Sequence, residues 1–508
     1  MKFNELEKKR AQLQFIKDKG KTLRERNILG QFSTPVQLAT DILRHANNFL
    51  PKEVQINFLD PAIGTGVFYS ALCQTFSSER IASAIGFEVD PFYGEAAQDL
   101  WSLTNLNYII DDFTKQDPKE NKYNLIICNP PYVRHHHIKD KKKELQDIVL
   151  KNMEVKISGL AGLYCYFILL AHKWMEKDGV AGWLVPSEFM DVNYGNVIKK
   201  YLLENVTLLQ IHRFEPSDVQ FDDALVSTAI VWFRNSKPEK NHSVQFTYGG
   251  NIETPLHTKS VNTDVLKDEH KWTRFPLLEC RDNNHGEILG DYFDIRRGIA
   301  TGDNKFFILS KEEIKEKGLS LEYFRPILPS PRYLKNDRVL SDACNNPLLD
   351  KELFVLDCNI PMDIIEKKHP FLYSYLVEGI NKGVSERYLC KTRRVWYTQE
   401  NRPPSRFYCT YIGRSGSLRE NAFRFIFNQS NAIVNNSYLI LYPKGILLDI
   451  LNKHPELNEK VFDVISGITD EAMMDEGRIY GGGMRKMEPM ELAKVSVSEI
   501  AKILEQYK

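Results

Sequence analysis

The sequence predicts an α/β fold in its N-terminal half, with a mostly parallel sheet of seven strands, and a mixed α+β domain in its C-terminal half. Between residues 56 and 235, short apolar runs alternate with helical patterns, the order of elements that builds a parallel sheet covered by helices. A polar segment that contains a proline follows at 236–245, and the pattern beyond it is irregular. We therefore predict a helical extension at 1–29, an α/β domain at 30–245 and a second domain at 246–508.

The seven predicted strands are short and apolar, and helical patterns lie between several of them. The predicted strands are Ile56–Asp60, Ala84–Glu88, Tyr108–Ile110, Asn124–Cys128, Ala181–Val185, Leu208–Arg213 and Val226–Phe233. The predicted helices are Val36–Leu43, Val67–Phe76, Gly94–Leu103 and Leu163–Lys177. Open sheets of this kind bind ligands beyond the carboxyl ends of their strands. The residues that follow each strand are therefore the first candidates for a site.

Composition narrows the class of protein further. The chain has 508 residues, of which 43% are hydrophobic and 26% are charged, a profile typical of a globular protein. Its formal net charge is zero, so a polyanionic partner would have to meet a locally basic surface. The eight cysteines form no CxxC pair, and no apolar run is long enough to cross a bilayer. We expect reduced thiols, a cytoplasmic protein, no metal and no membrane partner.

Glycines follow the first predicted strand, and an acid ends the second. Gly64 and Gly66 allow a tight turn in which the backbone can approach a ligand. Glu88 can accept both hydroxyl hydrogens of a ribose, with Asp90 as the second choice, although an acid before a proline also commonly starts a helix.

The third strand also ends in side chains that suit a nucleoside. Asp112 can accept a hydrogen bond from an adenine amino group, and Phe113 can cover the ring. The chain has neither a full GxGxxG nor a GxxxxGK[ST] motif. The acids and glycines at successive strand ends therefore favour S-adenosylmethionine over a dinucleotide or a nucleoside triphosphate.

The most specific motif, Asn129-Pro-Pro-Tyr132, follows the fourth strand. The Asn129 side-chain oxygen and the Pro130 backbone oxygen can each accept one hydrogen of a planar amino group, and the prolines Pro130 and Pro131 fix the backbone there. Both contacts stabilise the charge that develops on nitrogen during methyl transfer. Tyr132 offers a face for a base extruded from duplex DNA. The motif predicts methylation of adenine N6 by direct attack.

At this point the sequence resembles a known family. Residues 30–235 are similar to the catalytic domain of gamma-class amino DNA methyltransferases, which make N6-methyladenine in type II restriction–modification systems. The shared segments are GQFSTP at 30–35, DPAIGTG at 60–66, DDF at 111–113, NPPY at 129–132, LYCYF at 163–167 and GWLVP at 182–186. One departure is that this family frequently has a bulky aromatic residue where the first loop here has alanine.

The resemblance implies a Rossmann-like S-adenosylmethionine domain and further site residues. It places Thr34, Asp60, Pro61 and Phe167 at the cofactor, and Phe221 on a late loop that would sandwich the flipped base with Tyr132. Two of these positions have a plainer interpretation. Thr34 and the following proline can cap a helix, and Phe167 can be core. The product would be S-adenosylhomocysteine.

Basic residues concentrate in the predicted C-terminal domain, mainly at 382–424, where aromatic residues are interleaved. This composition suits phosphate contacts and base-edge readout, although a solvated basic face is the alternative. A glycine-rich segment at 480–486 could add backbone contacts to phosphates. The same region resembles, in patches, the target-recognition region of the family. The arginines chosen as DNA contacts are Arg296, Arg297, Arg393, Arg394, Arg402 and Arg406.

Three adjacent histidines, His135, His136 and His137, follow the NPPY loop. Adjacent side chains do not converge on one ion, so a DNA or substrate contact or a mobile polar loop is the preferred interpretation over a metal site.

The predicted partner is double-stranded DNA. A cognate restriction endonuclease would act on the same DNA sequence without necessarily contacting this protein, and the protein would methylate DNA as a monomer. Competing functions are a glutamine-amide methyltransferase, an RNA adenine methyltransferase, a fused endonuclease–methyltransferase and a non-catalytic DNA-specificity subunit.

Overall fold

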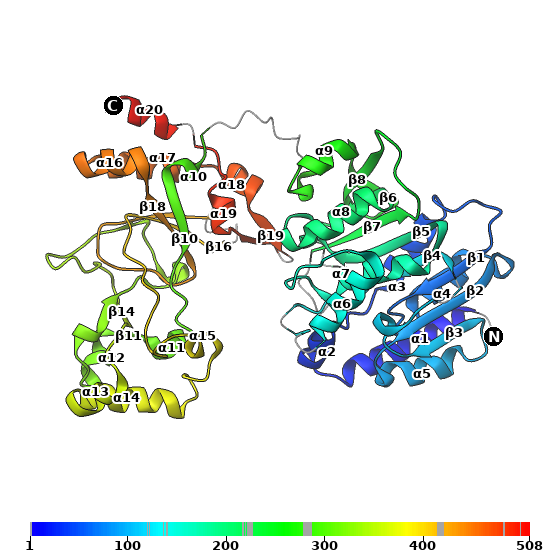
Figure 1. Ribbon diagram of the computed structural model, residues 1–508, viewed down its shortest axis with the longest axis horizontal. Coiled ribbons are helices and arrows are strands. Elements are labelled where there is room, and N and C mark those ends of the chain that lie inside the picture. Colours follow the sequence, from blue (N-terminus) through cyan, green and yellow to red (C-terminus); the bar gives the residue numbers. More distant parts are fainter. Residues whose placement is uncertain are drawn as a thin grey trace. The chain divides into compact units, whose positions relative to one another are not determined.

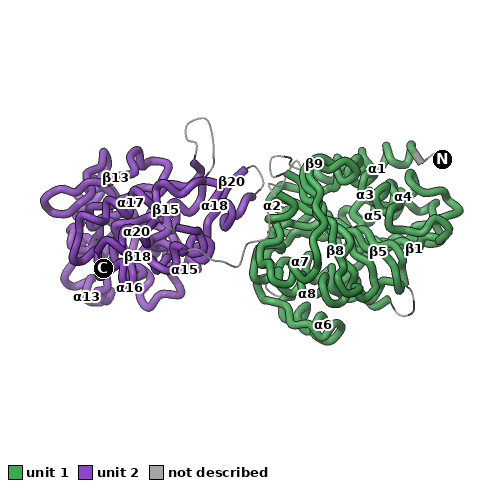
Figure 2. The backbone as a smooth tube through the Cα atoms, turned by 90° about the horizontal axis from the view of Figure 1, so that it is seen from above, with its two compact units in different colours: residues 1–281, 480–482 green, residues 282–479, 483–508 purple. Residues whose placement is uncertain are grey.

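The chain forms two compact units, which are described separately below. Unit 1 comprises residues 1–281 and 480–482, and unit 2 comprises 282–479 and 483–508 (Figure 2). The computed structural model describes residues 3–118, 120, 122–135, 137–138, 141–215, 218, 220, 227–277, 287–413, 421–480, 483–497 and 499–507.

Unit 1 is built on a nine-stranded sheet in the order β3-β2-β1-β4-β5-β7-β6-β8-β9. Strands β1 to β5 are parallel, whereas β7 is antiparallel to both β5 and β6. The strands are β1 Ile56–Asp60, β2 Ile81–Glu88, β3 Leu106–Ile110, β4 Tyr123–Cys128, β5 Met175–Pro186, β6 Thr207–Arg213, β7 Thr228–Arg234, β8 Ser243–Gly250 and β9 Pro255–Asn262.

Helices cover both faces of this sheet (Figure 1). Successive residues of β1 and β4 point to opposite faces: Phe58 and Leu125 pack with α3 and α4, while Leu59 and Ile126 pack with α6, α7 and α8. The helices of unit 1 are α1 Phe3–Lys19, α2 Leu23–Leu29, α3 Val36–Ala46, α4 Val67–Thr75, α5 Pro91–Trp101, α6 Lys142–Met153, α7 Leu163–Ala171, α8 Asn196–Glu204 and α9 Thr263–Asp268.

The predicted α/β layers are present, with shifted element ends. The helix expected to run from Leu163 to Lys177 stops at Ala171, because Met175 already pairs with Tyr123 as the first residue of β5. The helix expected from Gly94 begins three residues earlier, because Asp90 caps it by accepting the N–H of Phe92.

The predicted domain boundary at 245/246 differs from the structure, which divides the chain at 281/282. Strand β8 pairs in parallel with β6, and β9 pairs with β8, so the sheet continues to residue 262 and has nine strands rather than seven. Trp272 then packs edge-on against Phe246 of β8. The polar segment 236–245 is therefore a connection within the sheet and not a linker between domains.

Unit 2 contains three small sheets, in the orders β10-β18-β15-β17-β13, β11-β14-β12 and β16-β20-β19. The strands are β10 Phe293–Arg297, β11 Ile308–Ser310, β12 Phe324–Pro326, β13 Arg338–Val339, β14 Leu353–Leu356, β15 Phe407–Thr410, β16 Ile412–Gly413, β17 Phe425–Asn428, β18 Tyr438–Pro443, β19 Arg478–Tyr480 and β20 Met484–Lys486. The helices are α10 Leu289–Tyr292, α11 Asn304–Phe307, α12 Lys311–Glu316, α13 Met362–Lys368, α14 Pro370–Asn381, α15 Tyr388–Lys391, α16 Gly445–Lys453, α17 Leu457–Ser466, α18 Asp470–Glu476, α19 Pro489–Leu492 and α20 Glu499–Glu505.

None of the helices in the described part of the chain combines the length and the apolar character that crossing a membrane requires.

Candidate active site

A pocket of about 400 Å³ lies at the carboxyl ends of β1 to β4 in unit 1. Its walls come from the loops after these four strands, from the N-terminal helices and the segment before α3, and from α6 and α7. The side chains and loops named in the sequence analysis that line it are Thr34, Pro61, Gly64, Glu88, Asp111, Asp112, Phe113, Asn129, Pro131 and Phe167. The parallel strands thus bring together residues that lie up to 133 positions apart in the chain.

The Asn129 side chain is held in one orientation by the segment before α3. Its Nδ2 donates to the Phe32 carbonyl at 3.1 Å and to Thr34 Oγ1 at 3.0 Å. A carbonyl oxygen can only accept, so the nitrogen and not the oxygen of the amide must face Phe32. The Asn129 Oδ1 atom is buried and has no hydrogen-bond partner. The site therefore holds an acceptor that is oriented and unsatisfied.

Gly30 brings the same N-terminal segment against the NPPY loop. Its φ of +65° lies in the left-handed region, and a Cβ there would stand 2.5 Å from the Tyr132 nitrogen. The Tyr132 N–H donates to the Gly30 carbonyl at 3.3 Å. Glycine is required on both counts, because any side chain would strain the backbone and push the two segments apart.

Thr34 belongs to the site and does not cap the following helix. The N-cap of α3 is Pro35, which makes no side-chain cap hydrogen bond, and the Thr34 hydroxyl instead accepts from Asn129. Thr34 is 8% exposed and lines the pocket. The capping interpretation left open by the sequence is therefore wrong.

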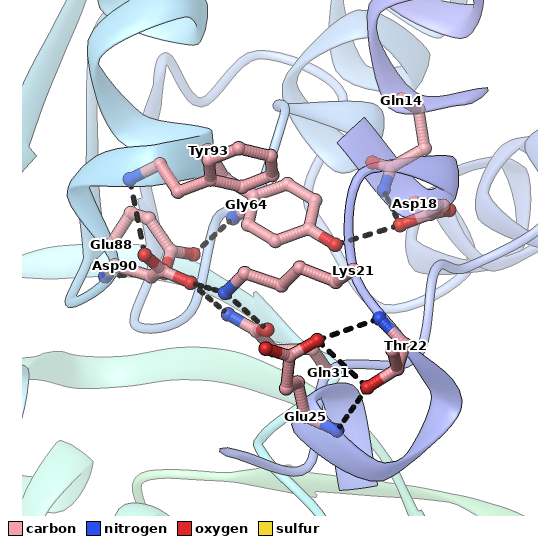
Figure 3. Close-up of polar contacts among 11 residues, drawn as sticks. Gln14, Asp18, Lys21, Thr22, Glu25, Gln31, Gly64, Glu88, Asp90 and Tyr93 are labelled. Atoms are coloured by element: carbon pink, nitrogen blue, oxygen red, sulfur yellow. Dashed lines mark hydrogen bonds and ion pairs between the residues drawn. The ribbon is translucent and has the colours of Figure 1, made fainter. Parts of the chain in front are cut away.

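Glu88 is joined to the glycine loop by a backbone hydrogen bond. Its Oε2 accepts the N–H of Gly64 at 3.1 Å, and its Oε1 accepts the N–H of Asp90 at 2.8 Å (Figure 3). Burial raises the pKa of Glu88 to about 7, and the neighbouring Asp90 charge acts in the same direction, against the two backbone hydrogen bonds. Glu88 lines the pocket, so its carboxylate can meet a ligand.

Asp90, the second choice for the ribose contact, is engaged elsewhere. It caps α5 and accepts hydrogen bonds from Lys21 Nζ and from Gln31 Nε2, the latter at 2.7 Å. These partners hold the pKa of Asp90 below its ordinary value, although burial opposes them. Asp90 is not among the residues that line the pocket. Glu88 is therefore better placed than Asp90 for contact with a ligand.

The third strand ends beside the pocket, where Asp112 and Phe113 both line it. The Asp112 side chain accepts from the Thr114 N–H at 3.1 Å, and its second oxygen lies 3.4 Å from Lys141 Nζ. The Phe113 ring packs against Phe167 of α7 with 5.5 Å between centroids. Asp112 thus combines a capping role with exposure to the pocket, and the two aromatic rings form one wall of it.

The loop after β1 owes its shape to buried contacts beneath it. Asp60 is fully buried, accepts the Ala62 N–H at 3.1 Å, and does not line the pocket; burial raises its pKa to about 8. Gly66 has a φ of +91°, and a Cβ there would stand 2.5 Å from Trp101 Nε1. Both residues shape the loop from below, whereas Gly64 and Pro61 face the pocket.

The N-terminal helix α1, which the sequence predicts only as an extension of the α/β domain, contributes to the pocket. Gln14 and Asp18 of α1 line it together with Ile28 and Leu29 at the end of α2. The only sequence signal was the spacing of two polar residues four positions apart on one helix face. That spacing is common on solvated helices, so it could not single out these side chains.

Of the two residues predicted to stack on a flipped base, the structure describes Tyr132 but not Phe221. The Tyr132 hydroxyl donates to the Leu184 carbonyl at 3.0 Å, and its ring lies 5.9 Å from the Phe32 ring with a tilt of 42°. These contacts hold a half-buried ring in a defined position. Phe221 lies outside the described residues, as does His136. His137 lines the pocket, and the described residues contain no cluster of three or more potential metal ligands.

The basic region of unit 2 departs in part from its predicted role. Phe407 and Tyr408 are buried because β15 lies in the middle of the five-stranded sheet and pairs on both sides. Tyr397 and Tyr411, which lie outside β15, are buried as well. Only Tyr388 among the interleaved rings is widely exposed within the described part, at 81%. The four buried rings are therefore not part of a surface on which aromatic and basic residues are interleaved.

The six candidate arginines also differ in how they are used. Arg393 donates to the carbonyls of Ala300 and Trp396 and is half-buried, so it supports the fold. Arg296 pairs with Asp294 and Arg402 with Glu400, while Arg297 lies over the Tyr411 ring at 3.8 Å from its centroid. Of the six, Arg297, Arg394 and Arg406 are exposed and form no ion pair with a described residue, but Arg297 donates to the Asn436 carbonyl and Arg406 to the Asn428 carbonyl.

The sheet order and the pocket at the carboxyl ends of β1 to β4 define a Rossmann-like α/β protein with a ligand-sized site. Residues 86–220 match the family model of the Eco57I restriction-modification methylase, and residues 270–508 match that of the C-terminal domain of the type II methyltransferase M.Eco57I.

Relatives align over most of the chain. It is 28% identical over 494 residues to the type II methyltransferase M.AccI of Acinetobacter calcoaceticus, covering 93% of this chain and 86% of that protein. It is 24% identical over 460 residues to the type II methyltransferase M.XamI of Xanthomonas campestris pv. amaranthicola, covering 87% and 80%. The structure of a DrdV–DNA complex shares the fold with a TM-score of 0.50 at 11% identity, covering 87% of this chain and 54% of that one. The chain is thus related to the type II methyltransferases of restriction–modification systems.

Proposed function

We propose that this protein is a site-specific DNA methyltransferase that transfers a methyl group from S-adenosylmethionine to N6 of adenine in a short duplex sequence, after the base has been flipped out. The observation that carries the proposal is the buried Asn129 Oδ1, which is oriented by two hydrogen bonds and lacks a partner. A buried unsatisfied oxygen destabilises a protein by about 1–3 kcal/mol, so its retention needs a reason. A substrate N–H donor supplies one.

The residues of the pocket fit S-adenosylmethionine. Glu88 would accept the ribose hydroxyls beside the glycine loop, and Asp112 would accept from the adenine amino group. Phe113 and Phe167 would pack against the adenine ring. The cofactor supplies an electrophilic methyl group on a positively charged sulfur. The acidic lining of the pocket complements that positive charge.

The NPPY loop prepares the amino nitrogen for attack. Asn129 Oδ1 and the Pro130 carbonyl oxygen each accept one amino hydrogen, which turns the nitrogen lone pair toward the methyl group. As the methyl group passes to the nitrogen, its bond to sulfur breaks and S-adenosylhomocysteine is left, and the two oxygens would stabilise the positive charge that grows on the nitrogen. The extra proton then leaves the nitrogen to solvent. Tyr132, fixed by its hydrogen bond to Leu184, stacks on the extruded base, and Phe221 covers the other face.

Recognition of the sequence is assigned to unit 2. Arg394 is the strongest candidate for DNA contact, because it is exposed and forms neither an ion pair nor a hydrogen bond with a described residue, whereas Arg406 donates to the Asn428 carbonyl. Arg296, Arg297 and Arg402 would have to leave an internal contact to reach DNA. A cognate restriction endonuclease would act on the same sequence, and the methylating form would be a monomer.

The proposal is tested in three separate reactions, each containing the protein and methyl-deuterated S-adenosylmethionine. The substrate is duplex DNA in the first, structured RNA in the second and a cell protein extract in the third. Each product is digested and analysed by mass spectrometry. Label in N6-methyladenine from DNA, lost with Asn129→Ala and kept with an exposed control such as Asp99→Asn, is the expected result. Label in cytosine, in RNA alone or in glutamine would refute the proposed substrate.

A further inference from the structure

Helix α1 forms part of the wall of the cofactor pocket. It packs on α4 and α5, and the side chains of Gln14 and Asp18 reach the pocket from it. Figure 3 shows Gln14, Asp18 and Tyr93 turned toward one another. A helix that precedes the α/β domain in the sequence thus supplies a carboxylate to its ligand site.

The Asp18 carboxylate is held by three hydrogen bonds. Its Oδ1 accepts from the Tyr93 hydroxyl and from Gln14 Nε2, each at 2.9 Å, and its Oδ2 accepts from Ser33 Oγ at 2.7 Å. All three donors are neutral. Within the described residues no lysine, arginine or histidine forms an ion pair with Asp18. A carboxylate has about four lone-pair sites, so one acceptor site remains for a ligand.

The hydrogen bonds also define where this carboxylate lies. Gln14 Oε1 accepts from Thr65 Oγ1 at 2.6 Å, so Asp18 is tied through Gln14 to the glycine loop. Glu88 bonds the N–H of Gly64 in the same loop. Ser33, the third partner, directly precedes Thr34, which holds Asn129. Asp18 therefore lies between the glycine loop and the segment that supports the catalytic loop.

We propose that Asp18 accepts a hydrogen bond from the α-ammonium group at the amino-acid end of the cofactor. The inference rests on the proposed function, because it needs S-adenosylmethionine in this pocket. The adenosine end is assigned to Asp112 and Glu88, so the amino-acid end must extend over the glycine loop toward Asn129, where Asp18 lies. An ammonium group donates charge-assisted hydrogen bonds, and a carboxylate with a free acceptor site can accept one.

The test compares two ligands on the full chain by calorimetry. S-Adenosylhomocysteine carries the amino-acid end, whereas 5′-methylthioadenosine has the same adenosine and sulfur but lacks the ammonium and carboxylate groups. Asp18→Asn should weaken S-adenosylhomocysteine binding by roughly 10-fold or more, the range for a charge-assisted hydrogen bond, and leave methylthioadenosine binding unchanged. Glu5→Gln, an exposed acid on the same helix, should change neither.

Glu88→Gln separates the two ends of the ligand. It should weaken both ligands alike, because both contain the ribose. If Asp18→Asn weakens both ligands equally, the residue only shapes the wall and the proposal is overturned. Unchanged S-adenosylhomocysteine affinity in Asp18→Asn overturns it as well, with the proposed function intact. If the wild-type chain binds neither ligand, the cofactor assignment itself is wrong and this inference falls with it.

Discussion

Thr34→Val isolates the hydrogen bond that orients the catalytic amide. Valine has nearly the shape of threonine but no hydroxyl, and Thr34 makes no cap contact that α3 could lose. Asn129 would keep only its bond to the Phe32 carbonyl. A neutral hydrogen bond contributes about 0.5–1.5 kcal/mol, which corresponds to a loss of roughly 2- to 12-fold in kcat. The loss should stay well below that of Asn129→Ala, for which we expect roughly 100-fold or more.

The assay is single-turnover methylation of a duplex, with cofactor affinity and thermal stability measured on the same preparations. Thr34→Ser keeps the hydroxyl and should retain the wild-type rate, so the series separates the oxygen from the methyl group. Cofactor affinity should change little, because Asn129 acts on the amino group. A Thr34→Val enzyme with the full rate, or one as slow as Asn129→Ala, would refute the view that Thr34 only positions the amide.

Glu88, Tyr132 and Arg394 each carry a further prediction. Burial raises the pKa of Glu88 to about 7, and the carboxylate is the form that accepts both ribose hydroxyls. Cofactor affinity should therefore fall as the pH drops through about 7. Calorimetry between pH 6 and 8 should show this pH dependence, and Glu88→Gln should abolish most of it. Replacement of the target adenine by 2-aminopurine should give enhanced fluorescence on binding, and Tyr132→Ala should reduce base capture by roughly 1–3 kcal/mol; no enhancement with the wild-type protein would contradict base flipping. If Arg394 contacts a phosphate, Arg394→Ala should lower the salt dependence of DNA binding by about one unit of slope on all sequences. If Arg394 reads a base, the substitution should weaken binding to the cognate site alone by about 1–3 kcal/mol. Titrations of cognate and scrambled duplexes at several salt concentrations distinguish the two roles, and unchanged binding to both duplexes would remove Arg394 from the interface.

The architecture of unit 1 was predictable because the motifs coincide with strand ends. Apolar strands separated by helical patterns identified the α/β layers, and a parallel sheet necessarily gathers its carboxyl ends at one edge. Glu88, Asp112 and Asn129 could therefore be placed together from their positions after successive strands. The residues 236–245 misled the prediction, because a proline-containing polar turn between two strands of one sheet looks like a linker when the pairing of β8 with β6 is unknown.

The contribution of α1 and the burial of the unit 2 aromatics could not be predicted for a related reason. Asp18 reaches the pocket only because α1 folds back on α4 and α5, a contact between distant segments with no local signal. Tyr408 is typical of both a base-stacking surface and a strand core, and only its place in the middle of a sheet decides between them. Arg393 is half-buried and Arg394 is exposed, a difference that the composition of the segment does not reveal.

The most direct test of the central claim is modification-sensitive long-read sequencing of DNA from cells that express the full chain. We predict N6-methyladenine at one fixed position of a single short sequence, at nearly every occurrence, and its absence from cells that express Asn129→Ala at the same level. DNA without modified adenine, with N4-methylcytosine instead, or with N6-methyladenine that persists in the Asn129→Ala cells would contradict the account.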